Sequence, residues 1–381
     1  MDGAGDATAS DLRHAGMAQH SMRLIRHYQD VPAEARQAVV ALGNFDGVHR
    51  GHQQVIAMAS RLAHDVTASL SGKSPPVEKS PRLEKSPLAV MTFEPHPRSY
   101  FRPDQPAFRL TPFRIKMRHL QALGVDYTFN LSFDAPLAAH TAEAFIREIL
   151  VDGLGVAHVV VGYDFCFGKN RGGNVAVLQE FGEKLGYGVT AVGACQDATG
   201  TIYSSTLIRD QLLAGDPAAA ALALGRPWEI EGRVEHGDKR GRQLGFPTAN
   251  VALGDYLEPR FGVYVVKAAI DDGGVPRWIG GVANLGRRPT VGGTRVQLEV
   301  NLFDFQGDLY GKHLRVAFLG FIRQEMKFAG LDQLKAQIAA DSATARQMLI
   351  DYAGPQPGQQ PADALITEIA SPGIAAPKAG S

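Results

Sequence analysis

Two histidines, His49 and His52, stand three residues apart with Gly51 between them. They follow an apolar run that ends at Gly43, and the string from there to Gln53 reads GNFDGVHRGHQ. This pattern indicates a strand, a glycine-spaced turn and the start of a helix. Such a turn directs backbone N–H groups and a helix N-terminus toward one point, which favours an anion. The pattern therefore predicts a polyphosphate site, with two ordinary surface histidines as the alternative.

Two later segments of the same half could add to such a site. The stretch 203–209, YSSTLIR, opens a predicted helix that Ser205 or Thr206 could cap, and its hydroxyls together with Arg209 could hold phosphates. By itself this stretch is more typical of a helix N-cap than of a ligand site. The loop 162–173 combines aromatic, basic and glycine residues after a predicted strand. It could stack a flat ring, or it could be a structured surface loop.

The second half of the chain carries a different set of residues. Glycines and basic residues between 232 and 245 could form a backbone cradle for phosphates. Pro247 then fixes a turn, and the side-chain oxygens of Thr248 and Asn250 suit Mg²⁺. Glu299 lies on the polar side of an alternating strand, where it could act as a general base. Spacing alone favours the alternative, an ordinary solvent-facing strand residue.

Composition limits the class of protein. The chain has 381 residues, of which 45% are hydrophobic and 20% charged, with 39 Lys and Arg against 39 Asp and Glu. This balance argues against a general nucleic-acid binder, which would carry a basic excess. No apolar run is long enough to cross a membrane, no secretory signal begins the chain, and two cysteines exclude a disulfide framework or a cysteine-rich zinc module. We expect a cytoplasmic protein of two or three domains that binds neither nucleic acid nor membrane, and whether it forms a weak homo-oligomer is left open.

Strands and helices alternate between residues 37 and 215. Apolar runs predict strands at 38–42, 88–93, 126–131, 158–161 and 188–192, and helical spacing predicts helices at 53–63, 115–123, 141–151 and 175–185. This order favours an α/β fold, a parallel sheet with helices on both faces.

Beyond residue 225 short β-type runs dominate. They lie at 228–234, 262–270, 278–283, 296–302 and 314–322, which indicates a small antiparallel barrel or sandwich, followed by two helices at 331–338 and 344–352. We divide the chain into a domain at 22–215, a linker helix at 216–225 capped by Asp216, and a domain at 226–353. The segments 1–21 and 354–381 are expected to be disordered tails, and the Ser-Pro-rich segment 71–87 an exposed insertion.

The two halves resemble two known enzyme families. GNFDGVHRGHQ, the FEPHP string at 93–97, the DF-x-FG loop at 164–168 and the stretch 203–209 are together similar to the HxGH nucleotidyltransferases, in particular to the FMN adenylyltransferase module of bacterial bifunctional FAD synthetases. GRQLGFPTAN at 241–250, GVANLGRRPT at 281–290 and LEVNLFDFQGDLYGK at 298–312 resemble riboflavin kinase. The resemblance implies a Rossmann-like N-terminal domain and an all-β, six-stranded C-terminal barrel with flanking helices.

The resemblance also implies two ATP-dependent reactions. Riboflavin would be phosphorylated to FMN in the barrel, and FMN would be adenylylated to FAD in the N-terminal domain with release of pyrophosphate. ATP is then a co-substrate, Mg²⁺ a cofactor, and riboflavin, FMN and FAD are ligands. Glu299 is implied as the catalytic base of the kinase, and His49 and His52 as catalytic residues of the adenylyltransferase.

The resemblance assigns the remaining contacts by motif. For ATP in the N-terminal domain they are Gly43, Asn44, Phe45, Asp46, His49, Gly51, His52, Ser205, Thr206 and Arg209, and for its flavin Asp164, Phe165, Phe167 and Arg171. For ATP in the kinase domain they are Gly241, Gly245, Pro247, Thr248 and Asn250, with Thr248 and Asn250 also holding Mg²⁺, and for its flavin Asn284, Arg323 and Glu325. The segments 281–290 and 323–328 are implied to belong to flexible loops that close the flavin site.

Three positions depart from the family patterns. Leu207 stands where a basic residue is usual, Cys166 where arginine is common, and Asn301 where histidine is usual. The first two leave open a riboflavin kinase with an impaired adenylyltransferase half, and a non-catalytic flavin carrier is a further alternative. The retained Glu299 argues against a carrier, because binding alone needs no base. For Asn301 we expect only a tuning effect, because strand alternation places it off the reacting centre or at least beside the face of Glu299.

Overall fold

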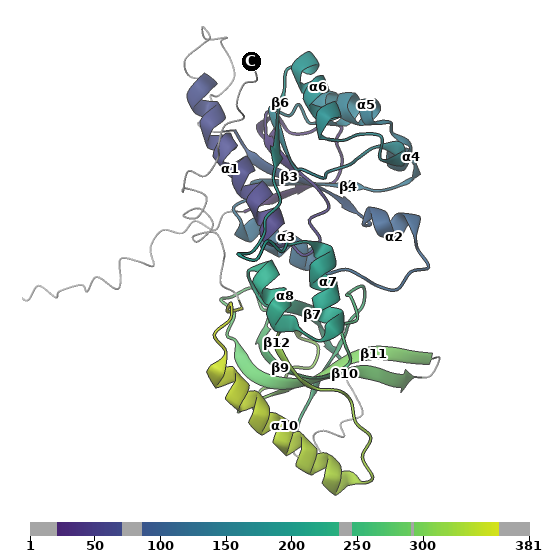
Figure 1. Ribbon diagram of the computed structural model, residues 1–381, viewed down its shortest axis with the longest axis vertical. Helices are drawn as coiled ribbons and strands as arrows, with labels where there is room; N and C mark the ends of the chain where they lie inside the picture. Colours follow the sequence, from purple (N-terminus) through teal and green to yellow (C-terminus); the bar gives the residue numbers. More distant parts are fainter. Residues whose placement is uncertain (1–20, 71–85, 236–245, 291–292, 358–381) are drawn as a thin grey trace, which may run out of the picture.

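The computed structural model describes residues 21–70, 86–235, 246–290 and 293–357. They form two lobes, a sheet covered by helices and a β-barrel, and the helices α7 (Ser205–Ala214) and α8 (Pro217–Leu224) lie between them (Figure 1). In the part of the chain so described, no helix is both long and apolar enough to cross a lipid bilayer.

The first lobe is built on a parallel sheet of six strands in the order β1-β4-β3-β2-β5-β6. Its strands are β1 (Arg23–Ile25), β2 (Val39–Leu42), β3 (Leu88–Glu94), β4 (Tyr127–Ser132), β5 (His158–Gly162) and β6 (Gly188–Val192). Along β2, Val40 and Leu42 face one buried cluster while Val39 and Ala41 face another. Strands covered on both faces read as unbroken apolar runs for this reason. The predicted parallel α/β arrangement is confirmed, and β1 is an unpredicted addition.

Helices cover both faces of this sheet. α1 (Arg50–Leu70) and α3 (Phe113–Ala122) pack on one face, and the π-helical segment η3 (Phe145–Gly153) and α6 (Val175–Leu185) pack on the other. The shorter helical segments are α2 (Pro97–Phe101), α4 (Ala135–Ala139), α5 (Ala142–Ala144), η2 (Ala33–Ala35) and η4 (Lys169–Arg171). Thr141 caps α5 as predicted, since its hydroxyl accepts the N–H of Ala144 at 3.1 Å.

The second lobe is a closed barrel in the order β10-β11-β8-β7-β12-β9. Its strands are β7 (Trp228–Glu235), β8 (Ala249–Ala252), β9 (Gly262–Ile270), β10 (Ile279–Thr290), β11 (Gly293–Leu302) and β12 (His313–Arg323). Because the sheet closes on itself, the second lobe is a barrel, and the alternative of a sandwich is wrong. The expectation of a flexible loop at 281–290 is wrong, because these residues belong to β10 and pair along its length with β11.

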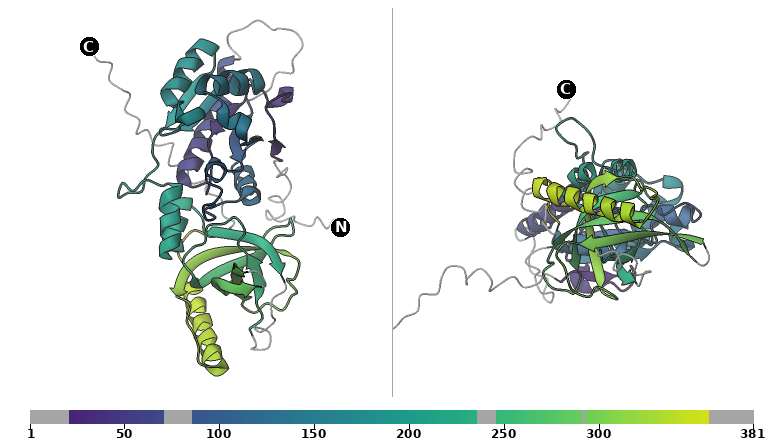
Figure 2. Two further views of the ribbon diagram at one scale, coloured as in Figure 1. Left: turned by 90° about the vertical axis from the view of Figure 1, so that its right-hand side faces the viewer. Right: turned by 90° about the horizontal axis from the view of Figure 1, so that it is seen from below.

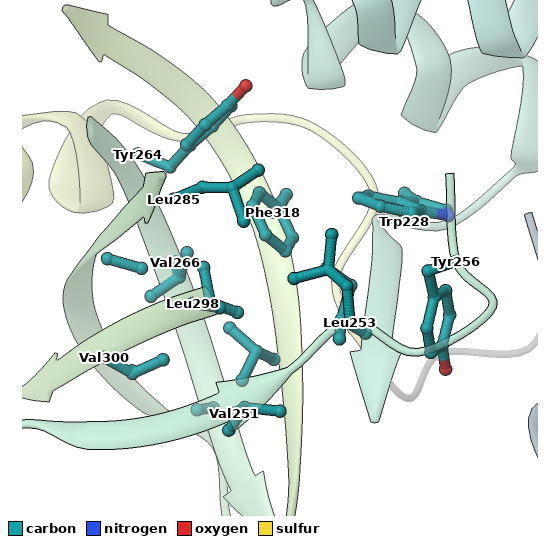
Figure 3. Packing of buried hydrophobic residues seen from close by; sticks show 14 of the residues in the cluster. Trp228, Val251, Leu253, Tyr256, Tyr264, Val266, Leu285, Leu298, Val300 and Phe318 are labelled. Carbon is teal, nitrogen blue, oxygen red and sulfur yellow. The ribbon is translucent and has the colours of Figure 1, made fainter. Parts of the chain in front are cut away.

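Alternate residues of the strands fill the barrel. Leu298 and Val300 point into the space that the strands enclose (Figure 3). Phe318 lies between Trp228 and Tyr264, with ring centroids 5.2 and 5.0 Å away. Aromatic pairs at such distances stabilise a core beyond the area they bury. A barrel of this size is filled by its own side chains, so we expect a ligand to bind outside it.

The barrel core continues into the helices between the lobes. Ile208 of α7 and Leu224 of α8 belong to the same buried cluster as Trp228, and Leu110 joins it from the first lobe. Asp216 caps α8 as predicted, with its carboxylate accepting the N–H of the third following residue at 2.9 Å. The helix predicted at 216–225 therefore packs against the barrel core on its buried side.

A single helix, α10 (Leu331–Asp351), lies along the outside of the barrel (Figure 2). The expectation of two helices at 331–338 and 344–352 is wrong. The residues between them include no glycine or proline that would break a helix. In the middle of α10, the buried Asp341 accepts two hydrogen bonds from Arg323 of β12, at 2.9 and 2.6 Å. This pair fixes the centre of the helix to the barrel.

Two predicted boundaries are also corrected. Ser86 and Pro87 were assigned to the exposed insertion but are buried, and the N–H of Ser86 donates to the carbonyl of Ala63 at 3.2 Å. Residues 354–357 were assigned to a disordered tail, but Gln356 accepts a hydrogen bond from Lys267 at 2.6 Å. The expectations for 1–20, 71–85 and 358–381 fall outside the described residues.

The substitution Asp341→Asn should destabilise the barrel by on the order of 3 kcal/mol, because it leaves the guanidinium of Arg323 without its buried counter-charge. Both tryptophans of the chain, Trp228 and Trp278, lie in this lobe, so urea unfolding followed by tryptophan fluorescence measures the loss. Asp304→Asn is the matched control, because Asp304 forms the same two-armed pair with Arg346 of α10 at the exposed surface. Equal unfolding midpoints for the two variants would contradict the anchoring role of Asp341.

Candidate functional site

The candidate site of the first lobe lies at the carboxyl edge of the sheet, beside β2. β2 lies between β3 and β5, and the chain proceeds to β3 on one side before it returns to β5 on the other. In open parallel sheets, ligands bind outside the carboxyl ends of the strands at such a point. The turn 43–49 leaves β2 there, next to the segments that follow β3 and β5.

His49 and His52 stack on each other at the start of α1, with ring centroids 3.7 Å apart. Burial and the neighbouring His52 lower the pKa of His49 well below its usual value. Burial and the charges of Lys116 and Arg209 lower the pKa of His52 to about 3. Both rings are therefore neutral at physiological pH and offer N–H donors without charge. The Nδ1 atom of His52 is buried and has no hydrogen-bond partner among the described residues, which fits a ligand oxygen.

Fixed cations surround the two rings. Lys116 of α3 is fully buried, and its Nζ donates to the carbonyl of Asn44 at 3.3 Å and to the hydroxyl of Thr92 at 3.1 Å. Burial lowers the pKa of Lys116 to about 8. Arg109, also buried, donates from both ends of its guanidinium to Glu94, one bond measuring 2.8 Å. The site thus presents positive charge together with neutral donors, a combination suited to a polyphosphate.

Asp46 lies beneath this site and organises it. Its side chain is 3% exposed and accepts the N–H of Leu110 at 3.0 Å and the Nη2–H of Arg209 at 2.5 Å. Arg209 also donates its Nε–H to the carbonyl of Phe108 at 2.9 Å. Asp46 was predicted as an ATP contact, but its carboxylate is engaged with protein groups. We infer that it positions Arg209 toward the site.

The predicted Ser-Thr segment enters the site from α7. Ser205 donates its hydroxyl to the carbonyl of Asp46 at 2.7 Å, and Thr206 is exposed in the first turn. Neither caps the helix, so that prediction is wrong. The cap is Ser204, whose hydroxyl accepts the N–H of Leu207 at 3.1 Å.

The other predicted residues of the turn differ in accessibility. Asn44 is exposed and Gly43 is half-buried, so both can face a ligand. The ring of Phe45 is buried and lies edge-on to His52 at 5.2 Å, so it supports the site from below. Gly51 leaves room for the ring of His49, because a Cβ at Gly51 would lie 3.1 Å from that ring.

The loop after β5 holds the predicted flavin contacts of this lobe. Phe165 and Phe167 stack at 5.7 Å, and Phe167 is buried in the core cluster that also contains Phe145. Asp164 and Arg171 are exposed. Phe167 therefore belongs to the core, and the partly buried Phe165 is the aromatic side chain of this pair that a flavin could reach.

In the second lobe the strand register places predicted residues in one row. Asn250 pairs with Glu299, Glu299 with Asn284, Asn284 with Val263, and Val263 with Arg323. Paired residues point to the same face of a sheet. Because Leu298 and Val300 face the core, the row of Glu299 faces outward. The candidate kinase site therefore lies on the outer surface of the barrel.

Glu299 lies beside a cation in this row. Its carboxylate accepts the Nε–H of Arg288 at 2.9 Å, and its side chain is 29% exposed. The hydrogen bond to Glu299 raises the pKa of Arg288 above its usual value. Glu325 lies 3.6 Å from the other arm of Arg288 and accepts a long bond of 3.5 Å from Asn284. Gly286 makes room for Glu325, because a Cβ there would lie 2.0 Å from a carboxylate oxygen.

Asn301 is also close to this site. It follows Glu299 by two residues, so it points to the same outward face. Of the two expected placements, the one off the site by alternation is wrong, and the one beside the face of Glu299 holds. Its Nδ2 donates to the carbonyl of Pro247 at 2.8 Å. Asn301 therefore holds the turn that leads to Thr248, which is half-buried, and Asn250, which is buried. The predicted phosphate contacts Gly241 and Gly245 lie outside the described residues.

Arg323 is not free to contact a flavin in this structure. Its Nε and Nη2 atoms bond Asp341, and its Nη1 donates to the carbonyl of Gln324 at 2.8 Å. Arg323 shares the row of Glu299 but serves the attachment of α10.

A metal ion in the kinase site would depend on neutral ligands. Over the described ranges, no group of three His, Cys, Asp or Glu side chains could hold a metal. The hydroxyl of Thr248 and the amide oxygen of Asn250 are hard donors, and Mg²⁺ commonly completes its shell with water and substrate phosphates. This donor set fits Mg²⁺ that arrives with ATP.

Sequence reasoning missed four charged residues of these sites: Lys116, Arg109, Glu94 and Arg288. Lys116 could have been recognised from the sequence, since it stands in a helix between Ile115 and Leu120, which both face the core. A lysine at an apolar position of a helix indicates a buried charge with partners. Arg109 and Arg288 had no such signal, because their partners are known only once the chain is folded.

Comparison with known proteins agrees with this geometry. A family model described as FAD synthetase matches residues 31–73 and 74–206, and one described as riboflavin kinase matches residues 224–349. The bifunctional riboflavin kinase/FMN adenylyltransferase of Escherichia coli (strain K12) is 42% identical over 86% of this chain and 97% of its own length. The protein of the same name from Pseudomonas fluorescens is 42% identical over 86% and 98%.

The two-lobed fold also has a solved counterpart. A crystal structure described as a macrolide-efflux protein from Streptococcus pneumoniae aligns with a TM-score of 0.71 at 31% identity, over 85% of this chain and 98% of that one. Since both lobes and nearly the full length of the relatives are matched, the chain belongs to the family of bifunctional riboflavin kinase/FMN adenylyltransferases.

Proposed function

We propose that this chain makes FMN from riboflavin and ATP on the barrel, and FAD from FMN and ATP at the edge of the sheet. The observation that carries the proposal is the presence of two separate sites with different chemistry. The barrel offers Glu299, a carboxylate on its outer face. The sheet edge offers two neutral imidazoles among buried cations.

On the barrel, Glu299 accepts the proton of the ribityl 5′-hydroxyl while that oxygen bonds to the γ-phosphorus of ATP and ADP leaves. Thr248 and Asn250 hold ATP with Mg²⁺, which when bound neutralises phosphate charge. Arg288 orients the carboxylate of Glu299 by its hydrogen bond. Asn284 and Glu325 offer polar contacts to the flavin beside the base.

At the sheet edge, a phosphate oxygen of FMN attacks the α-phosphorus of ATP, and pyrophosphate leaves with the electrons of the broken P–O bond. No protein nucleophile is required, so the rate depends on positioning and on stabilising charge. His49 and His52 donate neutral hydrogen bonds to phosphate oxygens, and Lys116 and Arg209 supply fixed positive charge. Phe165 contacts the flavin from the neighbouring loop.

The structure favours this function over a kinase with an impaired second half. Leu207 is partly buried against the core cluster of the barrel and α8, and Cys166 donates weakly to the carbonyl of Asp164 at 3.6 Å. Neither position interrupts the contacts of Arg209 or the stacking of the histidines. Both departures therefore leave the phosphate site intact.

Glu299→Gln should lower FMN formation by about 10²-fold or more, since an amide cannot accept the hydroxyl proton. FAD formation from supplied FMN should stay at the wild-type level. His52→Ala should give the reverse pattern, because the neutral imidazole donor is lost only at the sheet edge. Chromatography of riboflavin, FMN and FAD after incubation with ATP and Mg²⁺ measures both reactions in one sample. A parallel fall of both activities in either variant would contradict two separate sites.

FAD formation should weaken above about pH 8, because Lys116 loses its charge there and binds phosphates less well. Below that pH the lysine is protonated, and the histidines stay neutral through the range, so no second inflection is expected near pH 6.5. The measurement is kcat/KM for ATP against pH, which reports the free enzyme.

Lys116→Met is the control for that profile. It should reduce kcat/KM for FAD formation at neutral pH and remove the alkaline decline, while FMN formation keeps its wild-type profile. An alkaline decline that persists in Lys116→Met would assign it to another group.

Asn301→Asp should raise the KM for ATP in FMN formation, since a carboxylate cannot donate to the carbonyl of Pro247 and would repel it. Asn301→His is the matched variant, because a ring N–H can still donate. We expect it to stay close to the wild type, with FAD formation unchanged in both. An equal loss in the two variants would show that the bond to Pro247 is not what matters.

A further inference from the structure

A buried arginine stands at the junction of the two lobes. Arg226 lies between α8 and β7 and is 7% exposed. Its Nη2 donates to the carbonyl of Gly47 at 2.7 Å, and its Nη1 to the carbonyl of Val48 at 3.1 Å. Its Nε donates to the Nε2 atom of His119 at 3.0 Å. No carboxylate is among these acceptors, so the charge is held by backbone dipoles and an imidazole.

The two carbonyls belong to an unusual stretch of backbone. Gly47 has φ of 90° and Val48 has φ of 42°. A positive φ is strongly disfavoured for a β-branched residue, so Val48 keeps it only because its surroundings enforce it. His49 follows directly. The conformation of 47–48 therefore decides where the first of the paired imidazoles lies.

Arg226 and Gln53 enforce this conformation together. The Nε2 of Gln53 donates at 2.8 Å to the carbonyl of Val48 and at 2.8 Å to that of Leu224, the last residue of α8. Because a trans peptide is planar, turning the Val48 carbonyl toward Arg226 turns the N–H of His49 the opposite way. The contacts of Arg226 and Gln53 with the Val48 carbonyl, here called the clamp, thus orient both the backbone N–H and the ring of His49.

The barrel fixes Arg226 in turn. Trp228, two residues later, donates its indole N–H to the carbonyl of Leu110 at 2.9 Å, and the N–H of Leu110 donates to Asp46. The start of the kinase lobe therefore holds the turn 43–49 from two sides, through Arg226 and through the chain Trp228–Leu110–Asp46.

We propose that Arg226 is a positioning residue for FMN adenylylation, which acts by anchoring the carbonyls of Gly47 and Val48 and so fixing His49. The inference rests on the proposed function of the sheet edge. The kinase lobe would then contribute to both reactions, since Arg226, which aligns the adenylyl site, stands at the start of that lobe.

Arg226→Met tests the inference in the full-length enzyme. We expect kcat for FAD formation to fall by about 10²-fold, the effect typical of a small misplacement of reacting groups. The KM for ATP should change little, because the cations that bind phosphate stay in place. FMN formation should stay at the wild-type level. Arg226→Lys keeps the charge, but its single nitrogen cannot reach all four acceptors of the guanidinium, which are His119 and the carbonyls of Gly47, Val48 and Leu224. Its kcat should therefore lie between those of the wild type and Arg226→Met.

Arg114→Met is the matched control at the same junction. Arg114 is 58% exposed and pairs with Glu231 and Asp271, but Arg118 bonds both carboxylates as well, at 2.6 and 2.7 Å. This variant should keep both activities.

Three outcomes would overturn the inference. Full FAD formation in Arg226→Met would show that the clamp is dispensable. A joint loss of FAD formation, FMN formation and stability to urea would show a general structural role. A wild-type enzyme that makes FMN but no FAD would refute the proposed function of the sheet edge, and the role of Arg226 with it.

Discussion

The burial of the Asp46 carboxylate is the constraint on which the first lobe depends. A buried charge without partners costs several kcal/mol, so the fold must bring donors to it. The donors come from the 108–111 loop and from Arg209 of α7, and Ser205 bonds the carbonyl of the same residue. Segments more than a hundred residues apart in sequence thus meet at one side chain. Hydrogen bonding to the Asp46 carboxylate therefore fixes the position of Arg209 and of the turn 43–49. It also fixes Leu110, whose carbonyl accepts the indole N–H of Trp228.

The two sites solve opposite electrostatic problems. At the sheet edge a polyanion must bind and react with another anion, so the site collects buried cations and keeps its imidazoles neutral by burial. On the barrel a hydroxyl must lose a proton, so Glu299 stays partly exposed with Arg288 beside it. A carboxylate base buried as deeply as the histidines would resist ionisation. The filled barrel core explains why the kinase site lies on the outside.

The sequence predicted what depends on local pattern. α6, β6 and β9 begin and end at the predicted residues, because apolar periodicity and flanking glycines act within one segment. Prediction from the sequence failed where contacts with distant segments decide the local structure. The middle of α10 looked like a break because its apolar pattern fades there, and the Arg323 pair that holds Asp341 comes from a distant strand. Ser204, Ser205 and Thr206 each have a hydroxyl of the kind that caps a helix. Ser204 is the cap, and Ser205 instead donates its hydroxyl to the carbonyl of Asp46, a contact that only the folded chain reveals.

Leu207 shows why a motif departure has to be weighed in three dimensions. Its side chain is partly buried against the cluster that α7 shares with α8 and the barrel, so the apolar residue adds contacts between the lobes. The positive charge it lacks is supplied from other elements, by Lys116 of α3, by Arg109 and by Arg209, and the last of these is held by Asp46. A basic residue at this position would have to leave the apolar cluster to reach a phosphate. Leu207 thus adds apolar contact at the same junction where Arg226 holds the turn before His49.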